Sequence, residues 1–343
     1  MTNVEARPEE LVCETTACAE AIDIITPRDV PLGGPRAMTV RRTLPQRKRS
    51  FIGPWCFVDH FGPDDVAISG GMQVARHPHT GLATVTLLFE GTIEHIDSTG
   101  FSNVVKPGEV NLMIAASGVS HSEYSSATTV LLHGVQLWYA LPDALRNGMP
   151  QSQHFVAEPV AVPGGTVLTY LGEFAGRAAD IDTRVPALAA EVRIHTGQEI
   201  VLDLDPTYEH GVLLDSGDLE VEANGVQIPV GRDELAYLPV GPTQLRLRAG
   251  SDGPVRAVVI GGAPFGEPIV MWWNFIGRTH EEIVAYREAW MAEIGRESVP
   301  ELPAPGETYA DGTAFPRFGT FPADTPAPLP APVLPNVRIR PRG

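Results

Sequence analysis

Short runs of apolar and β-branched residues recur along most of the chain, and glycine or proline separates them. Between residues 74 and 141 these runs follow one another about every 8–12 residues, which is typical of an antiparallel sandwich or barrel. The same rhythm returns between residues 167 and 261, where Asn224-Gly225 is a strong signal for a type I′ hairpin. The pattern therefore predicts an all-β fold in which one β-unit is used twice.

A helical period appears only near the C-terminus. Thr279 followed by Glu282 has the spacing of a capping box at the start of a helix. The apolar residues that follow share one helical face: Ile283, Tyr286, Trp290, Met291 and Ile294. Residues 299–343 are rich in proline and show no period, so we expect an irregular or disordered tail laid over the surface.

These patterns divide the chain into six parts. We predict an N-terminal lead-in (1–34), a first barrel (35–145), a linker (146–165), a second barrel (166–265), a strand and helix (266–298) and a proline-rich tail (299–343). The start of the lead-in is polar and acidic, and we expect it to be mobile.

The composition narrows the class of protein. The chain has 343 residues, and 25 Lys and Arg against 42 Asp and Glu give a net charge of −17. This balance argues against direct contact with nucleic acid or an anionic membrane, although a partner protein could still connect the chain to DNA. We find no apolar run of membrane-spanning length, no signal-peptide pattern in residues 1–10 and no disulfide framework among the three cysteines. We therefore expect a cytoplasmic protein.

The stretch that carries the clearest chemistry is His77-Pro78-His79, just before a strand-like run at 83–89. Two histidines at i and i+2 on a strand point to the same face. His121-Ser122-Glu123 repeats this spacing. Neighbouring strands could thus direct three imidazoles and one carboxylate at one ion, a set that suits Fe(II), Mn, Ni, Cu or Zn. Either pair alone would more simply consist of surface or structural residues, so the metal interpretation depends on both.

Further motifs make the chain resemble the pirin family of the cupin superfamily. Gly71 and His77-x-His79 resemble the first half of the cupin metal motif, and Gly118-Val119-Ser120-His121 resembles the end of the second half. The pirin-like segments span residues 40–45, 57–63, 77–81, 88–91, 117–123, 136–138 and 268–270. The resemblance covers about residues 35–296. It implies a bicupin with iron in the N-terminal barrel only, bound by His77, His79, His121 and Glu123.

The family includes quercetin 2,3-dioxygenases and a nuclear, redox-sensitive transcriptional co-regulator. The resemblance implies a metal-dependent dioxygenase of the quercetinase type, which opens a small aromatic substrate, a flavonol or related phenol, with O2. Its cofactor would be one divalent metal, Fe(II) first, with Mn, Ni, Cu or Zn as alternatives. Glu123 is the candidate base for the substrate hydroxyl, by loosening from the metal. One alternative is a non-enzymatic redox sensor acting through a protein partner, and another is a different cupin reaction such as isomerisation.

Two details refine the expected site. Many cupins carry a glutamate four residues after the second histidine of the motif, and that position is Ala83 here, so Glu123 would be the only negative ligand. Five further residues are expected to line the pocket: Asp59, His60, Met113, Gln136 and Trp138. A structural role competes with pocket lining for His60, and His95 and His133 are expected to be satisfied structural histidines.

Overall fold

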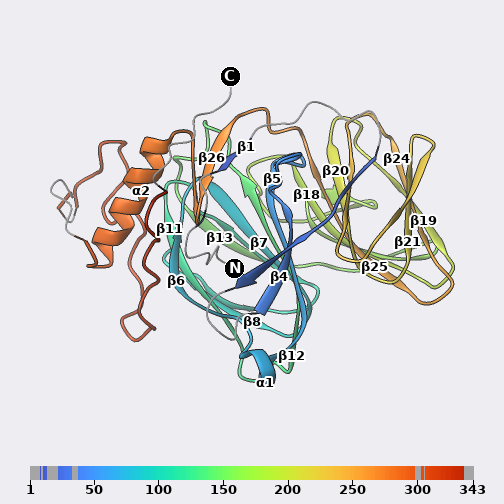
Figure 1. The fold of residues 1–343 in the computed structure, drawn as a ribbon, viewed down its shortest axis with the longest axis horizontal. Helices are drawn as coiled ribbons and strands as arrows, with labels where there is room; N and C mark the ends of the chain where they lie inside the picture. Colours follow the sequence, from blue (N-terminus) through green and yellow to red (C-terminus); the bar gives the residue numbers. More distant parts are fainter. Residues whose placement is uncertain are drawn as a thin grey trace.

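The computed structural model describes residues 8, 11–13, 22–32, 38–297, 303–304 and 306–335. The expected mobile start of the chain lies outside these residues, as do both ends of the proline-rich tail. Two β-barrels lie side by side, and the long C-terminal helix sits on the far side of the first barrel (Figure 1). The prediction of an all-β chain with two barrels and a C-terminal helix is confirmed.

The first barrel consists of a seven-stranded and a four-stranded sheet. In spatial order the large sheet contains β13 (Gln151–Val156), β10 (Glu109–Ile114), β7 (Leu82–Glu90), β12 (Leu131–Ala140), β5 (Trp55–Asp65), β4 (Met38–Leu44) and β3 (Arg28–Leu32). The small sheet contains β6 (Gln73–His79), β11 (Val119–Ser125), β8 (Ile93–Asp97) and β9 (Ser102–Val105). A one-turn helix, α1 (Val66–Ser69), follows β5.

The second barrel repeats this plan. Its large sheet contains β14 (Val160–Val162), β15 (Gly165–Leu171), β18 (Ala187–Ile194), β25 (Val255–Gly262), β20 (Glu209–Ser216), β23 (Leu235–Leu238) and β2 (Asp23–Ile25). Its small sheet contains β19 (Glu199–Asp203), β24 (Gln244–Ala249), β21 (Leu219–Ala223) and β22 (Val226–Val230), and β16 (Glu173–Phe174) pairs with β17 (Arg177–Ala178). Asn224 and Gly225, with φ of 49° and 74°, join β21 to β22 as the predicted hairpin requires.

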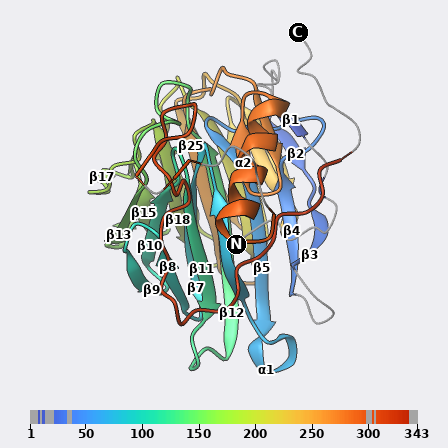
Figure 2. The same cartoon turned by 90° about the vertical axis from the view of Figure 1, so that its left-hand side faces the viewer.

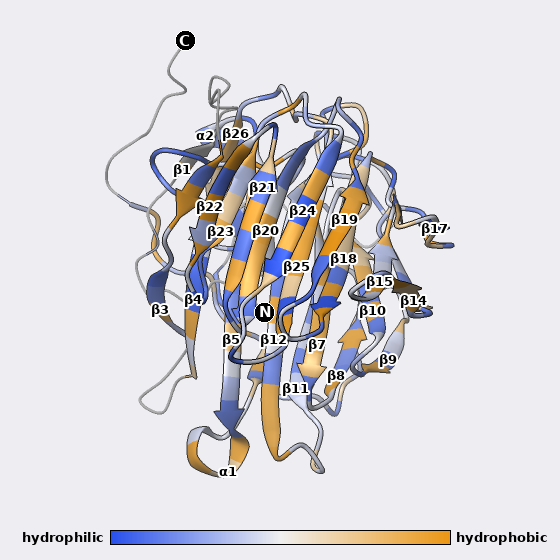
Figure 3. Cartoon of the chain, turned by 90° about the vertical axis from the view of Figure 1, so that its right-hand side faces the viewer, coloured by the Kyte–Doolittle hydropathy of each residue, from blue (hydrophilic) through white to orange (hydrophobic). Residues whose placement is uncertain are grey.

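The second barrel is filled by its own apolar side chains. Val192, Val212, Val221, Leu247 and Val259 belong to one buried cluster inside it. Figure 3 shows hydrophilic and hydrophobic residues alternating along β21 and β24, as expected for strands with one face in the core and one in solvent. The interior of this barrel is thus a packed core.

A shared core joins the two barrels through their seven-stranded sheets. Val58 and Leu137 from the first barrel and Tyr237 and Ile260 from the second belong to one buried cluster. Trp55 also donates its Nε1 hydrogen to the carbonyl oxygen of Gly261 at 2.9 Å. The barrels therefore share one hydrophobic interface.

Segments assigned by sequence to the linker and the lead-in also form strands. β13 and β14 lie within residues 146–165 and pair with β10 and β15, one in each barrel. β2 and β3 lie within residues 1–34 and pair with β23 and β4, again one in each barrel. These are short strands at sheet edges, where prolines are tolerated and the alternation of apolar residues is weak.

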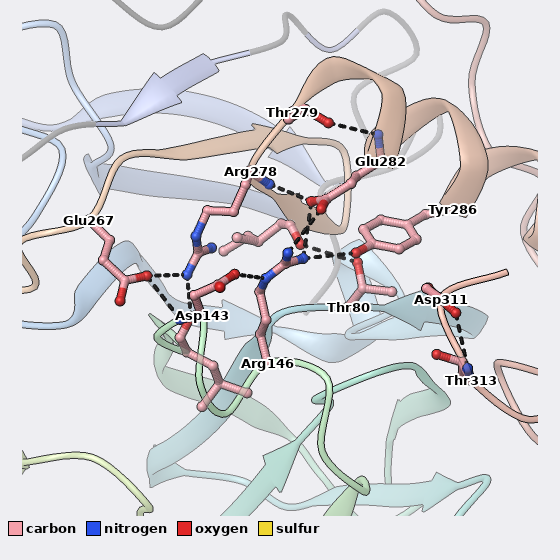
Figure 4. A network of polar contacts seen from close by, with 12 residues as sticks. Thr80, Asp143, Arg146, Glu267, Arg278, Thr279, Glu282, Tyr286, Asp311 and Thr313 are labelled. Carbon is pink, nitrogen blue, oxygen red and sulfur yellow. Dashed lines mark hydrogen bonds and ion pairs between the residues drawn. The ribbon is translucent and has the colours of Figure 1, made fainter. Parts of the chain in front are cut away.

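The helix and tail close the outer side of the first barrel. α2 (His280–Glu293) is capped by Thr279, whose hydroxyl accepts a hydrogen bond from Glu282 N. The predicted apolar face of α2 is buried against a three-stranded sheet, which consists of β1 (Leu11–Cys13), β26 (Ile269–Trp272) and β27 (Phe275–Gly277). Arg146 anchors the start of α2 by a two-pronged ion pair with Glu282 (Figure 4). No helix in the described ranges is long and apolar enough to cross a bilayer.

The described part of the tail is irregular and runs from α2 along the small sheet of the first barrel (Figure 2). Phe318 is fully buried, with its ring centroid 5.4 Å from Trp290 and 5.9 Å from Phe275. The Phe318 carbonyl accepts a hydrogen bond from the Ser120 hydroxyl on β11 at 2.8 Å. The tail is therefore fastened to the same sheet that carries the candidate site.

Candidate metal centre

The small sheet of the first barrel places three histidines on one inward face. Side chains alternate along β6, so His77 and His79 point the same way, as predicted. β11 runs antiparallel to β6, and its register places His121 opposite His77. All three side chains are fully buried.

The three imidazoles converge on one point. The Nε2 atoms of His79 and His121 are 3.1 Å apart, and the ring centroids of His77 and His121 are 4.2 Å apart. One ring nitrogen from each histidine lies within 4.8 Å of the other two. His77 Nε2 is buried without a hydrogen-bond partner, which costs free energy unless something else takes up its lone pair.

The outer nitrogens of two rings are held by backbone carbonyls. His77 Nδ1 lies 2.9 Å from the oxygen of Ala75, and His79 Nδ1 lies 3.2 Å from the oxygen of Asn274. A carbonyl can only accept, so the proton sits on Nδ1 and the Nε2 lone pair faces inward. These residues therefore fit a metal ion that prefers imidazole ligands.

Burial keeps these histidines neutral. It lowers the pKa of His77 to about 3 and holds the pKa values of His79 and His121 well below their ordinary value. Only a neutral imidazole can bind a metal, so all three are ready for binding at neutral pH without first losing a proton.

Glu123 joins the site beside His121. It follows a bulge in β11 and lies opposite His95 on β8. One ligand atom each from Glu123, His121 and His95 lies within 4.8 Å of the other two. Burial alone would raise the pKa of Glu123, but the electrostatic surroundings of the carboxylate outweigh burial and leave its pKa below the ordinary value. Glu123 is therefore an ionised carboxylate. The Thr86 hydroxyl, across the barrel, lies 3.3 Å from Oε1.

His95 and Asp97 complete the surroundings of His121, and sequence reasoning did not place them there. His95 Nε2 lies 3.0 Å from Asp97 Oδ2, and His95 Nδ1 lies 3.4 Å from His121 Nδ1. If His95 donates to Asp97 from Nε2, its Nδ1 accepts from His121 and leaves the Nε2 lone pair of His121 free for the site. The spacing of residues 95 and 97 was visible in the sequence, but the pairing of β8 with β11 was not.

Four of the expected pocket residues lie in the first barrel at different distances from the histidines. The Trp138 ring is nearly perpendicular to that of His79, with centroids 5.1 Å apart. Gln136 accepts a hydrogen bond from the Thr86 hydroxyl at 2.9 Å. Asp59 is held by Arg42 in a two-pronged ion pair, and Met113 packs with Ala115 and Val119. Trp138 thus packs against a candidate ligand, His79.

His60 is placed elsewhere. It is the neighbour of Asp59 on β5, and successive side chains on a strand point to opposite faces. Its Nε2 lies 2.9 Å from Asp215 on β20 of the second barrel. The structure therefore brings His60 together with residues of the other barrel.

Ala83 also faces away from the histidines. It is fully buried in the shared core with Val85 and Leu87, on one face of β7, while Thr86 faces the site. A longer side chain at residue 83 would point into the contact between the barrels. Its small size here suits that contact.

Comparisons with known proteins agree with this architecture. A family model described as Pirin matches residues 37–139, and one described as Pirin C-terminal cupin domain matches residues 189–294. A Pseudomonas aeruginosa protein named "Putative quercetin 2,3-dioxygenase PA1205" is 38% identical over 89% of this chain and 97% of its own length. A pirin-like protein of Caulobacter vibrioides is 32% identical over 77% of this chain and 91% of its own.

Solved structures show the same fold. A quercetin 2,3-dioxygenase from Acinetobacter baumannii is 32% identical, with a TM-score of 0.79 over 93% of this chain and 97% of its own. A bacterial pirin from Escherichia coli, solved in complex with nickel(II), has a TM-score of 0.55 at 16% identity over 71% of this chain and 100% of its own. The second likeness concerns the fold alone.

Proposed function

This chain belongs to the pirin family of bicupins, and from that premise we propose that it is a metal-dependent dioxygenase of the quercetinase type. The substrate would be a flavonol or related phenol, opened by O2. The observation that carries the proposal is the convergence of His77, His79 and His121 inside the first barrel. The relatives named as quercetin dioxygenases support the reaction class.

The residues present suit one divalent metal, and we propose Fe(II) with Glu123 as the fourth ligand. A bound divalent ion would supply Lewis acidity that lowers the pKa of the substrate hydroxyl. Glu123 is buried and ionised, so it can accept the proton of that hydroxyl. The ring of Trp138 beside His79 offers an aromatic face for orienting a planar substrate.

The test is a metal analysis of the purified protein followed by O2 uptake with quercetin and a panel of smaller phenols. We expect about one metal ion per chain at this site and O2 uptake that depends on it. His121→Ala should lose both. Uptake that survives complete removal of metal would contradict the proposal.

A second candidate function rests on the depth of the site. His77, His79 and His121 are 0% exposed and Glu123 is 1% exposed, so a flavonol cannot reach them in this conformation without an opening movement. A metal-dependent redox sensor that acts through a protein partner needs no such access. Bound metal without O2 uptake on any phenol would favour the sensor.

A further inference from the structure

A second group of metal-binding side chains lies where the two barrels meet. His60 on β5 and His133 on β12 come from the first barrel, and Asp215 on β20 comes from the second. All three are buried, at 0%, 5% and 0% exposure. One ligand atom from each lies within 4.8 Å of the other two.

The distances suit a shared ion. The Nε2 atoms of His60 and His133 are 3.3 Å apart, and Asp215 Oδ1 lies 2.9 Å from the first and 2.6 Å from the second. Ligand atoms about 2.1 Å from one metal ion, at angles of about 80–110°, lie roughly 2.7–3.4 Å apart. Two of the three separations fall in this range, and the His133–Asp215 separation lies just below it. At the first site, the Nε2 atoms of His79 and His121 are separated by a similar distance, 3.1 Å.

A proton on the outer nitrogen of His60 would leave the inner nitrogen facing Asp215 as a lone pair. His60 Nδ1 lies 2.7 Å from Asp233 Oδ1, so the proton of the neutral ring belongs on Nδ1, although the contact is not aligned as a good hydrogen bond. The Nε2 lone pair then faces both the lone pairs of Asp215 Oδ1 and the ring nitrogen of His133. This arrangement repels unless a second proton or a metal ion occupies the space between them.

The surroundings leave negative charge for such a cation. Asp215 is fully buried, and its Oδ1 lies against both imidazoles. Arg256 lies 3.4 Å from Asp215 Oδ2 but is shared with Glu191 at 3.5 Å. Arg41 pairs with Asp233 at 2.9 Å, on the far side of His60. Oδ1 of Asp215 therefore faces the two imidazoles without a guanidinium of its own.

We propose that His60, His133 and Asp215 form a second metal site, for a divalent ion that prefers mixed imidazole and carboxylate ligands, such as Zn²⁺, Ni²⁺ or Co²⁺. Asp233 orients His60 in the manner of a carboxylate behind a metal-bound histidine. Since the ligands come from both barrels, the ion would tie one barrel to the other. This site is separate from the proposed oxygenase centre.

The test measures how many equivalents of Co²⁺ bind to the full, metal-free chain. Calorimetry and visible absorption would monitor the titration. We expect two equivalents for the unaltered protein. His121→Ala should keep one equivalent, with its visible bands, and the additional substitution His133→Gln should remove it. Asp233→Asn in the His121→Ala background should weaken the remaining site about 10–100-fold. His154→Gln, a matched change outside both clusters, should keep two equivalents.

Two results would overturn the proposal. One is a single equivalent in the unaltered protein that is lost in His121→Ala, which would place the bound ion at the first site and leave the second site empty. The other is a second equivalent that survives His133→Gln. Absence of any bound Co²⁺ in the unaltered protein would also overturn the proposal, and that measurement needs no substitution, so the proposal stays testable even if a variant folds poorly. Loss of O2 uptake with intact binding at this second site would count only against the proposed oxygenase function.

Discussion

Each candidate histidine ligand of the first site has a partner at its outer ring nitrogen, which favours a free lone pair on the inner nitrogen that faces the metal. Backbone oxygens of Ala75 and Asn274 lie at the outer nitrogens of His77 and His79, and His95 lies at the outer nitrogen of His121. Glu123 is the only acidic residue among the four. Positioning and basicity are thus separated, because the imidazoles are fixed while the carboxylate is the group able to take a proton.

Glu123→Gln should separate binding from turnover. Glutamine keeps the shape and one oxygen donor but cannot accept a proton from the substrate hydroxyl. We expect much of the metal to stay bound and O2 uptake with quercetin to fall by about 100-fold or more. Metal analysis and an oxygen electrode would check this. Full activity in Glu123→Gln would exclude Glu123 as the base.

The low pKa of His77 makes the stability of the metal-free protein depend on pH. The pKa of His77 is about 3 when folded and about 6.5 when unfolded, so between these values the unfolded chain binds more protons. The free energy of unfolding should therefore fall as the pH falls through this window. One such histidine contributes a slope of about 1.4 kcal/mol per pH unit.

Urea unfolding of the chelator-treated protein between pH 6 and pH 4.5 would measure that slope, with the pH steps chosen inside the window set by the two pKa values. His77→Gln should show a shallower dependence than the unaltered protein. His154→Gln, a change at a partly exposed histidine, should not. Equal slopes in all three proteins would show that His77 titrates as an exposed histidine.

At the scale of elements, the tail and α2 form one packed unit on the barrel. Phe318 fills the space between Trp290 of α2 and Phe275 of β27, and its backbone bonds to Ser120 of β11. Arg317, its neighbour, lies 3.1 Å from the oxygen of Ser117. The buried ring of Phe318 thus helps to hold an otherwise irregular segment against the sheet that carries His121.

Phe318→Ala should release this segment. Removing a buried phenylalanine typically costs about 3–5 kcal/mol, and here the loss falls on contacts that hold the tail. We expect residues 306–335 to become sensitive to protease and to exchange amide hydrogen faster, while the barrels stay folded. Val333→Ala, at a side chain that is 80% exposed, is the matched control. Equal protection of the tail in both variants would contradict this account.

At the scale of the whole molecule, the shared core makes the barrels depend on each other. Leu137 of β12 is fully buried between the seven-stranded sheets, in the same cluster as Tyr237 of β23. Exposing one sheet would expose apolar surface of the other, which costs about 25 cal/mol per Å². The barrels should therefore unfold together.

Leu137→Ala should lower the stability of the entire chain by about 2–5 kcal/mol in one transition. Scanning calorimetry and two spectroscopic probes would follow it, and the probes should give coincident curves. Val201→Ala, on a partly exposed strand position of the second barrel, should change the stability little. Separate transitions for the two barrels would show that the shared core does not couple them.

The sequence allowed prediction of features that depend on neighbours along the chain. The common face of His77 and His79, the turn at Asn224 and the start of α2 at Thr279 all follow from local periods or turn chemistry. The repeated spacing made His121-Ser122-Glu123 a candidate, but only the family resemblance supported its approach to His77, because register between distant strands is not visible in periodicity. The contact of His60 with Asp215 depends on how two barrels pack, which no local pattern encodes.

The N-terminal strands have a consequence for the order of folding during synthesis. β2 at residues 23–25 pairs with β23, and the Ile25–Leu235 partners are separated by 235 − 25 = 210 residues. At about 5–20 residues per second, a ribosome would need roughly 10–40 s to make the later strand. β3, only a few residues after β2, can meanwhile pair with β4 in the first barrel. β2 must therefore wait, without its native partner, until most of the second barrel has emerged.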